Sequence, residues 1–175
     1  MKKVTKTIML ILVCFNCFSQ SEISRKLSVF QDYTGKWSHE THQIPFSGNT
    51  VVEHGEANLF PELSSTYLTL DVTLNAESGS TRHYKQLITY SEDQNQYISR
   101  YLYSNTSVMV EEFGVYDSNT NTLSFAGINP WASQLENGIN IKTSLTFKNN
   151  KILLEVNELR PNGTWEIGYR SLFTR

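Results

Sequence analysis

Short stretches in which apolar and polar residues alternate follow one another along most of this chain. In residues 139–147 every second position, from Ile139 to Phe147, shares one face, and the positions between carry polar or charged side chains. Residues 122–128 and 151–159 alternate in a similar way. A period of two is typical of strands in a sheet that is dry on one face and solvated on the other. The pattern therefore predicts antiparallel sheet.

Ten such stretches follow one another, and turn-forming residues separate most of them. We predict strands over residues 35–41, 50–60, 65–74, 81–90, 96–103, 108–116, 122–128, 139–147, 151–159 and 164–174. Asn149-Asn150 is the sharpest hairpin signal, because asparagine tolerates the positive φ of a tight two-residue turn. Parallel strands would need crossover helices, and none is available among these stretches. We therefore predict an all-β fold, a single antiparallel up-and-down barrel of about ten strands, since closure removes exposed sheet edges.

A helical period appears once, ahead of the strands. Ile23, Leu27 and Phe30 recur at i, i+4 and i+7 within residues 21–32. This spacing predicts a short amphipathic helix with one apolar stripe, which we expect to plug one end of the barrel. The alternative is a disordered leader.

The first 19 residues have the composition of a removable export signal. Three lysines lie within the first six residues, residues 8–13 are apolar, and small side chains at Cys17 and Ser19 precede a cleavage site before Gln20. The apolar stretch is short for a membrane span. We therefore predict a signal peptide over residues 1–19, a barrel domain over residues 20–175, and an exported, periplasmic or secreted protein with no transmembrane segment in the mature chain.

A lipoprotein signal is the rival interpretation of the same segment. Cys14 or Cys17 would then be acylated, but Val13 and Asn16, which precede them, are not the small residues that lipoprotein processing prefers. Cleavage therefore remains the preferred interpretation, and lipid anchoring the less favoured one.

Loss of residues 1–19 changes the charge and the cysteine content. It removes three of the 15 basic residues and none of the 17 acidic ones, which leaves a net charge of −5. A mildly acidic surface without a basic stripe argues against nucleic acid and anionic lipid as partners. Both cysteines leave with the segment, so the mature chain has no disulfide and no thiol for catalysis or metal binding.

Several short motifs in this order resemble a known superfamily. They are Leu27 and Tyr33 ahead of Gly35-Lys36-Trp37, the loop Pro45-Phe46-Ser47-Gly48, Tyr116-Asp117 before Leu123-Ser124-Phe125-Ala126-Gly127, and the ending Asn162-Gly163-Thr164-Trp165 to Phe173-Thr174-Arg175. Together they resemble the lipocalin and fatty-acid-binding (calycin) superfamily, and more closely a bacterial family of secreted lipocalin-like domains of unknown function. The resemblance implies a ten-stranded barrel with an internal cavity, and no particular activity.

The resemblance also implies a structural role for one tryptophan. In calycins the tryptophan of Gly-x-Trp lies over the closed end of the barrel, and a basic residue near the last strand covers its ring. Trp37 matches the tryptophan, and Arg170, with Arg175 next, is the best-placed basic residue. The nitrobindins, barrels of related shape, hold heme through a histidine late in the chain, but this chain has no histidine after His83. We therefore predict no cofactor.

Motifs for metal binding and catalysis are absent from the sequence. His39 and His42 flank Glu40-Thr41, but on a strand they point to opposite faces and cannot share an ion, so we predict no metal site. No nucleophile elbow or phosphate-binding glycine loop occurs. An enzyme acting on a hydrophobic substrate stays open as an alternative, with His39 and His83 as the first residues to inspect.

Charged residues on otherwise apolar strand faces are the best indication of a ligand site. Arg100 shares a face with Ile98 and Leu102, and a buried arginine needs a carboxylate, either from the protein or from a ligand. Glu112 is the protein carboxylate we consider as its partner. The opposite parity would instead point Tyr97, Ser99, Tyr101 and Tyr103 inward.

We predict that the barrel binds a small, mostly apolar or amphipathic molecule in its interior. The expected lining residues are Arg100, Tyr101, Glu112, Phe125 and Tyr169, with Trp131 at the mouth. Trp131 serves equally well as a packed loop anchor. A third alternative, beside binding and catalysis, is a protein-interaction module with a solid core.

Overall fold

The structure is a computed structural model that describes residues 21–46, 48–104, 108–130 and 138–175. This described part holds a helix α2 (Glu22–Leu27), a 3-10 helix η1 (Ser28–Tyr33) and ten strands. These are β1 (Gly35–Gln43), β2 (Val51–Glu62), β3 (Tyr67–Ala76), β4 (Thr81–Ser91), β5 (Gln96–Tyr103), β6 (Met109–Asp117), β7 (Thr122–Asn129), β8 (Ile139–Lys148), β9 (Lys151–Leu159) and β10 (Trp165–Thr174). The all-β prediction is confirmed, and each strand end lies within two residues of its predicted position.

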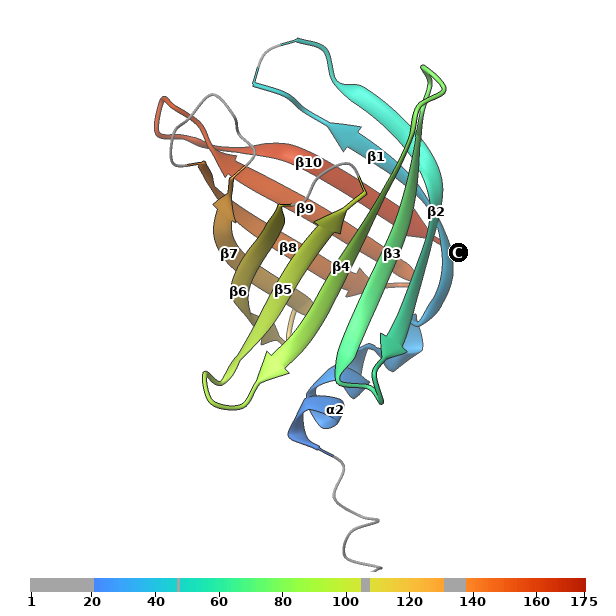
Figure 1. Cartoon of the computed structure of the whole chain (residues 1–175), viewed down its shortest axis with the longest axis vertical. Helices are drawn as coiled ribbons and strands as arrows, with labels where there is room; N and C mark the ends of the chain where they lie inside the picture. Colours follow the sequence, from blue (N-terminus) through green and yellow to red (C-terminus); the bar gives the residue numbers. More distant parts are fainter. Residues whose placement is uncertain (1–20, 47, 105–107, 131–137) are drawn as a thin grey trace, which may run out of the picture.

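The strands close into an antiparallel barrel, as Figure 1 shows. Each strand pairs with its neighbours in sequence, and β1 pairs with β10 at the seam. Closure leaves no strand edge free for pairing with another chain. Alternate residues point inward, so that β8, for example, buries Ile139, Ile141 and Leu145 while Asn140 and Lys142 face outward.

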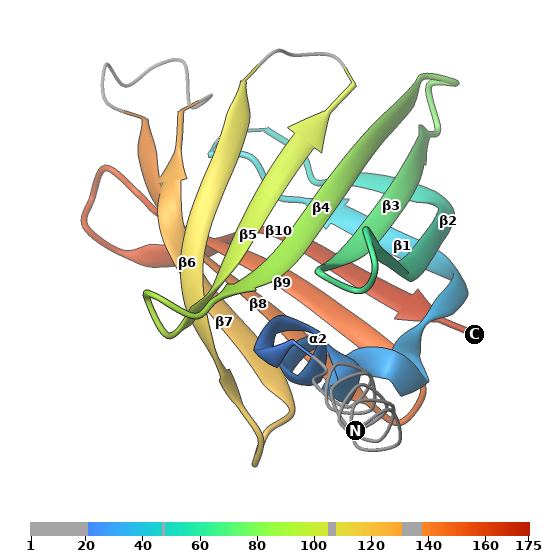
Figure 2. The same ribbon diagram turned by 60° about the horizontal axis from the view of Figure 1, so that its bottom comes forward.

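One end of the barrel is covered by α2 and η1, which lie across it in Figure 2. Phe30 is completely buried there, with its ring 4.8 Å from the ring of Phe147 and 5.2 Å from that of Tyr116. Leu27 is buried beside it. The predicted helix and its position are confirmed, and burial of its apolar stripe explains why so short a helix is ordered.

Trp37 packs at this closed end, where its indole nitrogen donates to the backbone oxygen of Tyr33 over 3.0 Å. Arg175, and not Arg170, lies over the indole ring, with its guanidinium carbon 4.3 Å from the ring centre. The choice of Arg170 was therefore wrong. The register explains why: Ser38 faces Thr174, which brings Trp37 next to Arg175, whereas Arg170 faces His42. Arg170 instead forms an ion pair with Glu155 over 2.6 Å.

None of the helices in the described part is long and apolar enough to cross a membrane. The predicted signal segment, residues 1–19, lies outside the described residues.

Candidate functional site

A cavity of about 530 Å³ occupies the half of the barrel away from α2 and η1. It reaches the end of the barrel at which β1, β3, β5, β7 and β9 end and β2, β4, β6, β8 and β10 begin, which we call the mouth and which is uppermost in Figure 1. Gln43 at the end of β1, Arg82 at the start of β4 and Tyr103 at the end of β5 line it there. The barrel is thus closed at one end and hollow at the other.

Tyrosine rings are the most prominent feature of the cavity wall. Tyr84, Tyr101, Tyr103 and Tyr169 all line it. The ring centres of Tyr84 and Tyr103 are 5.7 Å apart, and the Tyr169 hydroxyl donates to that of Tyr84 over 3.4 Å. Burial raises the pKa of all four phenols. They are therefore uncharged at neutral pH.

Aliphatic side chains fill most of the remaining wall. The lining includes Val51, Leu74, Val110, Ile141, Leu154 and Val156. Each comes from an inward position of its strand, so the same alternation that builds the barrel also makes the cavity apolar. Such a wall favours a ligand with an apolar body.

Five buried polar side chains lie at and behind the inner end of the cavity, and we call them the floor cluster: Gln86, Ser99, Tyr101, Glu112 and Thr143. Tyr101 and Thr143 line the cavity. Strand register brings the others beside them, because Gln86 is opposite Tyr101, and Ser99 is opposite Glu112. Gln86 donates to Ser99 over 3.0 Å, and Thr143 donates to Glu112 over 2.6 Å.

Glu112 is the unusual member of the floor cluster. It is fully buried, and within the described part its Oε2 atom has no hydrogen-bond partner. Burial raises the pKa of the Glu112 carboxyl to about 7, against the opposing effect of the Thr143 hydrogen bond. The Tyr101 hydroxyl is buried as well and has no well-formed hydrogen bond to a described residue. The floor therefore holds unused hydrogen-bonding capacity in an apolar setting.

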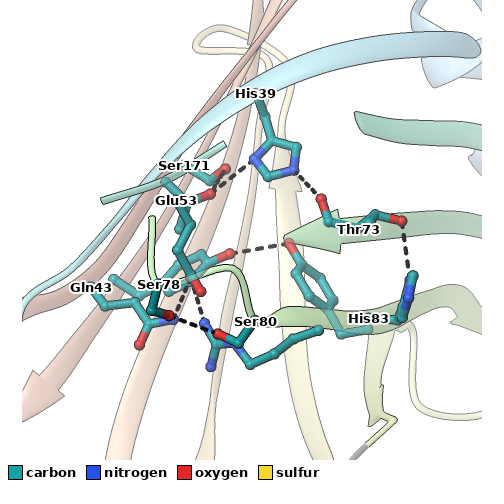
Figure 3. A network of polar contacts seen from close by, with 12 residues as sticks. His39, Gln43, Glu53, Thr73, Ser78, Ser80, His83 and Ser171 are labelled. Carbon is teal, nitrogen blue, oxygen red and sulfur yellow. Dashed lines mark hydrogen bonds and ion pairs between the residues drawn. The ribbon is translucent and has the colours of Figure 1, made fainter. Parts of the chain in front are cut away.

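An ion pair lies to one side of the mouth. Arg82 lines the cavity and pairs with Glu53, whose side chain is almost completely buried. Gln43 donates to the same Glu53 oxygen over 2.7 Å. Figure 3 shows Gln43 and Glu53 side by side within this polar network. Glu53 thus has two donors, and the charge of Arg82 is compensated.

A second arginine holds the β1–β2 connection against β9 and β10. Arg160 is 6% exposed and forms ion pairs with Glu158 and Glu166 over 3.1 and 3.2 Å. It also donates to the backbone oxygen of Ile44 over 3.2 Å, and its guanidinium carbon is 4.1 Å from the ring centre of Phe46. Because Ile44 lines the cavity, Arg160 fixes one wall of the mouth.

His39 is placed as a structural group, whereas His83 lies at the edge of the cavity. His39 is buried, and its Nε2 faces the backbone oxygen of Thr73 at 2.9 Å (Figure 3). Nε2 therefore donates, and Nδ1 accepts from Thr41 over 3.1 Å. Burial lowers the pKa of His39. His83 has an exposed side chain whose Nδ1 is 3.1 Å from Thr73 Oγ1. Among the described residues no group of three acidic, histidine or cysteine side chains is placed to hold a metal ion.

The structure brings together some of the predicted lining residues and separates others. Tyr101 and Tyr169 line the cavity, and Glu112 lies behind its floor. Phe125 is buried in the core and does not line the cavity. Trp131 lies outside the described residues.

Arg100 was assigned to the wrong face. It points outward and pairs with Glu111 over 2.6 Å, whereas Tyr97, Ser99 and Tyr101 of the same strand point inward. The physical reason is that this parity buries tyrosine rings and leaves the guanidinium in contact with water. Glu112, the other charged residue considered for the interior, does point inward. In β5 the alternative, with the tyrosines inward, is the observed arrangement.

Sequence reasoning missed several residues of the site. Tyr84 follows the inward alternation of β4, so the sequence pattern could have predicted that its side chain points into the barrel. Arg160 and Arg82 were not found, because each lies next to a turn, where alternation does not show which way a side chain points. Thr143 was placed on the inward face, but its bond to Glu112 depends on a pairing across strands that a single sequence does not show.

A closed antiparallel barrel with one plugged end and one hollow end is the class of fold that these observations define. The chain belongs to the family described as "Protein of unknown function (DUF1579)", whose model matches residues 24–175. Among solved structures it is similar to Rv2717c from M. tuberculosis, with a TM-score of 0.63 over 85% of this chain and 96% of that chain. The two share 9% sequence identity, so the likeness shows the fold alone. No curated protein matches the sequence.

Proposed function

We propose that this protein is a lipocalin-like barrel that binds a small, mostly apolar molecule in the cavity at its mouth. The observation that supports this most strongly is the cavity itself. Its volume of about 530 Å³ falls within the range of sites for small molecules, about 300–1,000 Å³. A barrel built only to present loops to a partner would have no need of a hollow interior.

The construction of the two ends fits this function. Phe30 and the rest of the plug fill the closed end, so a ligand has to enter and leave through the mouth. At the mouth, Arg160 holds Ile44 and Phe46 in place through a backbone hydrogen bond and a ring contact. A rigid wall of this kind lowers the entropic cost of ordering a binding site when the ligand arrives.

Binding is better supported than catalysis. Both ring nitrogens of His39 are engaged in hydrogen bonds inside the wall, and the side chain of His83 is exposed. His83 lines the cavity near the start of β4, at the mouth, and its Nδ1 is 3.1 Å from Thr73 Oγ1. Among the described residues, Glu112 has a carboxyl pKa raised to about 7 by burial, and it is shielded from the cavity behind Tyr101 and Thr143.

The test is the binding of an uncharged fluorescent probe, N-phenyl-1-naphthylamine, to the purified protein. We expect saturable fluorescence enhancement at one site. Val156 lines the cavity, so Val156→Phe should fill part of it and weaken binding by about tenfold or more. Val115 is 63% exposed on the outer face, so Val115→Phe is the matched control and should bind like the wild type.

Two results would contradict the proposal. One is the absence of saturable enhancement with a correctly folded protein. The other is equal weakening by Val156→Phe and Val115→Phe, which would place the probe somewhere other than the interior. Thermal unfolding of both variants checks that each retains its fold.

We also propose that the protein is exported, because residues 1–19 have the composition of a signal peptide. The mass of the denatured protein from its own host tests this. A chain that begins at Gln20 supports export with cleavage. A chain that begins at Cys17 with added acyl mass supports a lipid anchor, and a chain that begins at Met1 would contradict both.

A further inference from the structure

The charges around the cavity are unevenly compensated. Among the described residues, two arginines come close to it, and both already have carboxylate partners. Arg82 pairs with Glu53, and Arg160 pairs with Glu158 and Glu166. The stretches between β5 and β6 and between β7 and β8 that lie outside the described residues contain neither lysine nor arginine. An anionic ligand would therefore find no free arginine or lysine in the described interior.

Glu112 is in the opposite situation. In the described part of the chain, no arginine, lysine or histidine forms an ion pair with it, and the polar contact of its carboxyl group is the hydroxyl of Thr143. The groups that face it from neighbouring strands are uncharged: Ser99 and Tyr101 of β5, Thr143 of β8, and Gln86 of β4 next to Ser99. A buried carboxylate without a counter-charge is costly, and a cation placed near it removes much of that cost.

Thr143 connects this carboxyl group to the cavity. Its hydroxyl hydrogen is directed to Glu112 Oε1, so its oxygen can accept through two lone pairs. The Tyr101 hydroxyl interacts with Thr143 on one side, and the second lone pair can accept from a ligand. Thr143 also lines the cavity. A donor on a ligand at the floor can therefore bind Thr143 and be linked to Glu112 through one intervening hydroxyl, and such chains of hydrogen bonds polarise and strengthen one another.

The tyrosine wall has the electrostatic character that a cation requires. The faces of aromatic rings carry partial negative charge and attract ammonium groups within about 6 Å. Tyr101 and Tyr103 stack with ring centres 6.2 Å apart, and Tyr84 lies 6.2 Å from Tyr101. A cavity with several tyrosine rings and one uncompensated carboxyl group beyond its floor is suited to a positively charged group.

We propose that the ligand is an amine: an apolar, ring-sized body carrying one protonated amino group that lies at the floor, against Thr143 and the tyrosine rings, with Glu112 as its counter-charge. This inference rests on the proposed function, since it requires that the cavity be occupied. It excludes free carboxylic acids, such as fatty acids, as the preferred ligands. It also replaces the arginine clamp that the sequence suggested with a carboxylate.

The test compares three ligands that share an indole ring and differ in one group: tryptamine, indole-3-ethanol and indole-3-propionate. Binding is measured by titration calorimetry at about pH 8, where Glu112 is ionised. We expect tryptamine to bind about tenfold or more tighter than the alcohol, and the carboxylate to bind more weakly than the alcohol. Equal affinities, or tightest binding of the carboxylate, would overturn the inference.

Variants assign the preference to Glu112. Glu112→Gln keeps the shape of the side chain and removes its charge, so tryptamine should lose its advantage while the affinity for indole-3-ethanol stays within about twofold. Glu111→Gln is the matched control, because Glu111 points outward to Arg100 and should leave the preference intact. A preference for the amine that survives in Glu112→Gln would also overturn the inference.

The outcome separates this inference from the proposed function. If N-phenyl-1-naphthylamine binds in the cavity and tryptamine shows no advantage, the barrel binds small molecules but the amine assignment is wrong. If neither the probe nor any of the three indoles binds, both proposals fail. Should Glu112→Gln not fold, Thr143→Val, which keeps the shape and removes the linking hydroxyl, should reduce the tryptamine preference in its place.

Discussion

Glu112 and Gly127 lie directly opposite each other on β6 and β7, and the missing side chain of Gly127 leaves the space that the glutamate occupies. A Cβ atom at position 127 would come within 2.8 Å of Glu112 Cγ and 2.7 Å of the backbone oxygen of Glu111. The buried carboxyl group is therefore accommodated by a neighbouring strand. The position of the Glu112 carboxyl group is thus supported by the packing of the barrel interior.

The first prediction concerns pH. In the folded protein the Glu112 carboxyl keeps its proton up to about pH 7, whereas in the unfolded chain it loses the proton near its ordinary value of 4.5. Unfolding therefore releases this proton between the two values. The contribution of Glu112 to the free energy of unfolding should fall as pH rises through this window, by about 3 kcal/mol in total.

Chemical denaturation from about pH 4 to pH 8 measures this effect. In Glu112→Gln the free energy of unfolding should fall less as pH rises, and the variant should be more stable than the wild type near pH 8. Glu111→Gln, which alters the outward ion pair with Arg100, should keep the wild-type profile. A profile that is unchanged in Glu112→Gln would show that this carboxyl group is not the one that titrates.

The second prediction concerns the seam. Arg175 lies over Trp37 and donates to the backbone oxygen of Thr34 over 2.5 Å. Arg175→Ala should lower the free energy of unfolding by about 1–2 kcal/mol, through loss of the cation–π contact and the hydrogen bond. Arg170→Ala should cost about 0.5 kcal/mol or less, because its ion pair with Glu155 is partly exposed. The reverse order of the two variants in urea unfolding would contradict the observed register.

The third prediction concerns the plug. Phe30 is fully buried against Phe147 and Tyr116, so Phe30→Ala should lower the free energy of unfolding by about 3–5 kcal/mol. Val29 is 47% exposed, and Val29→Ala should change the free energy of unfolding by about 0.5 kcal/mol or less. Thermal and urea unfolding compare the two. Similar small losses for both variants would mean that the plug does not contribute to the core.

The fourth prediction concerns the mouth. Arg160→Ala removes the hydrogen bond to Ile44 and the contact with Phe46, which releases the β1–β2 connection from β9 and β10. We expect N-phenyl-1-naphthylamine to leave this variant about tenfold faster than the wild type in stopped-flow displacement. Arg100→Ala, on the outer face, should leave the rate unchanged. Equal exit rates for both variants and the wild type would show that the probe leaves by another route.

Much of the fold could be predicted from the sequence because alternation and turn residues are local signals. Asn149-Asn150 joins β8 to β9, and both residues have the positive φ that the turn requires, 52° and 55°. The apolar stripe through Leu27 and Phe30 correctly gave the plug. The register between β1 and β10 could not be predicted, because it depends on pairing between strands that are distant in sequence. For this reason Arg170 was predicted to cover Trp37 in place of Arg175.

The site was harder to predict for a related reason. In β5 both faces carry plausible inward residues, since Ile98 and Leu102 compete with Tyr97 and Tyr101. Alternation alone cannot choose between them, and the cost of burying Arg100 decides the outcome. The inward position of Glu112 was predicted correctly. The charge balance around it also depends on the ion pairs of Arg82 and Arg160. Alternation does not predict these pairs, because the partners are distant in sequence or lie next to turns.

The most direct test of the central claim, that the barrel interior holds a small molecule, is native mass spectrometry of the protein purified under non-denaturing conditions from its own host. We expect the wild type to carry a non-covalent adduct that is lost on denaturation, and Val156→Phe, with its cavity partly filled, to carry little or none. A wild-type protein with only the mass of the bare chain, or an adduct that Val156→Phe retains in full, would contradict the account.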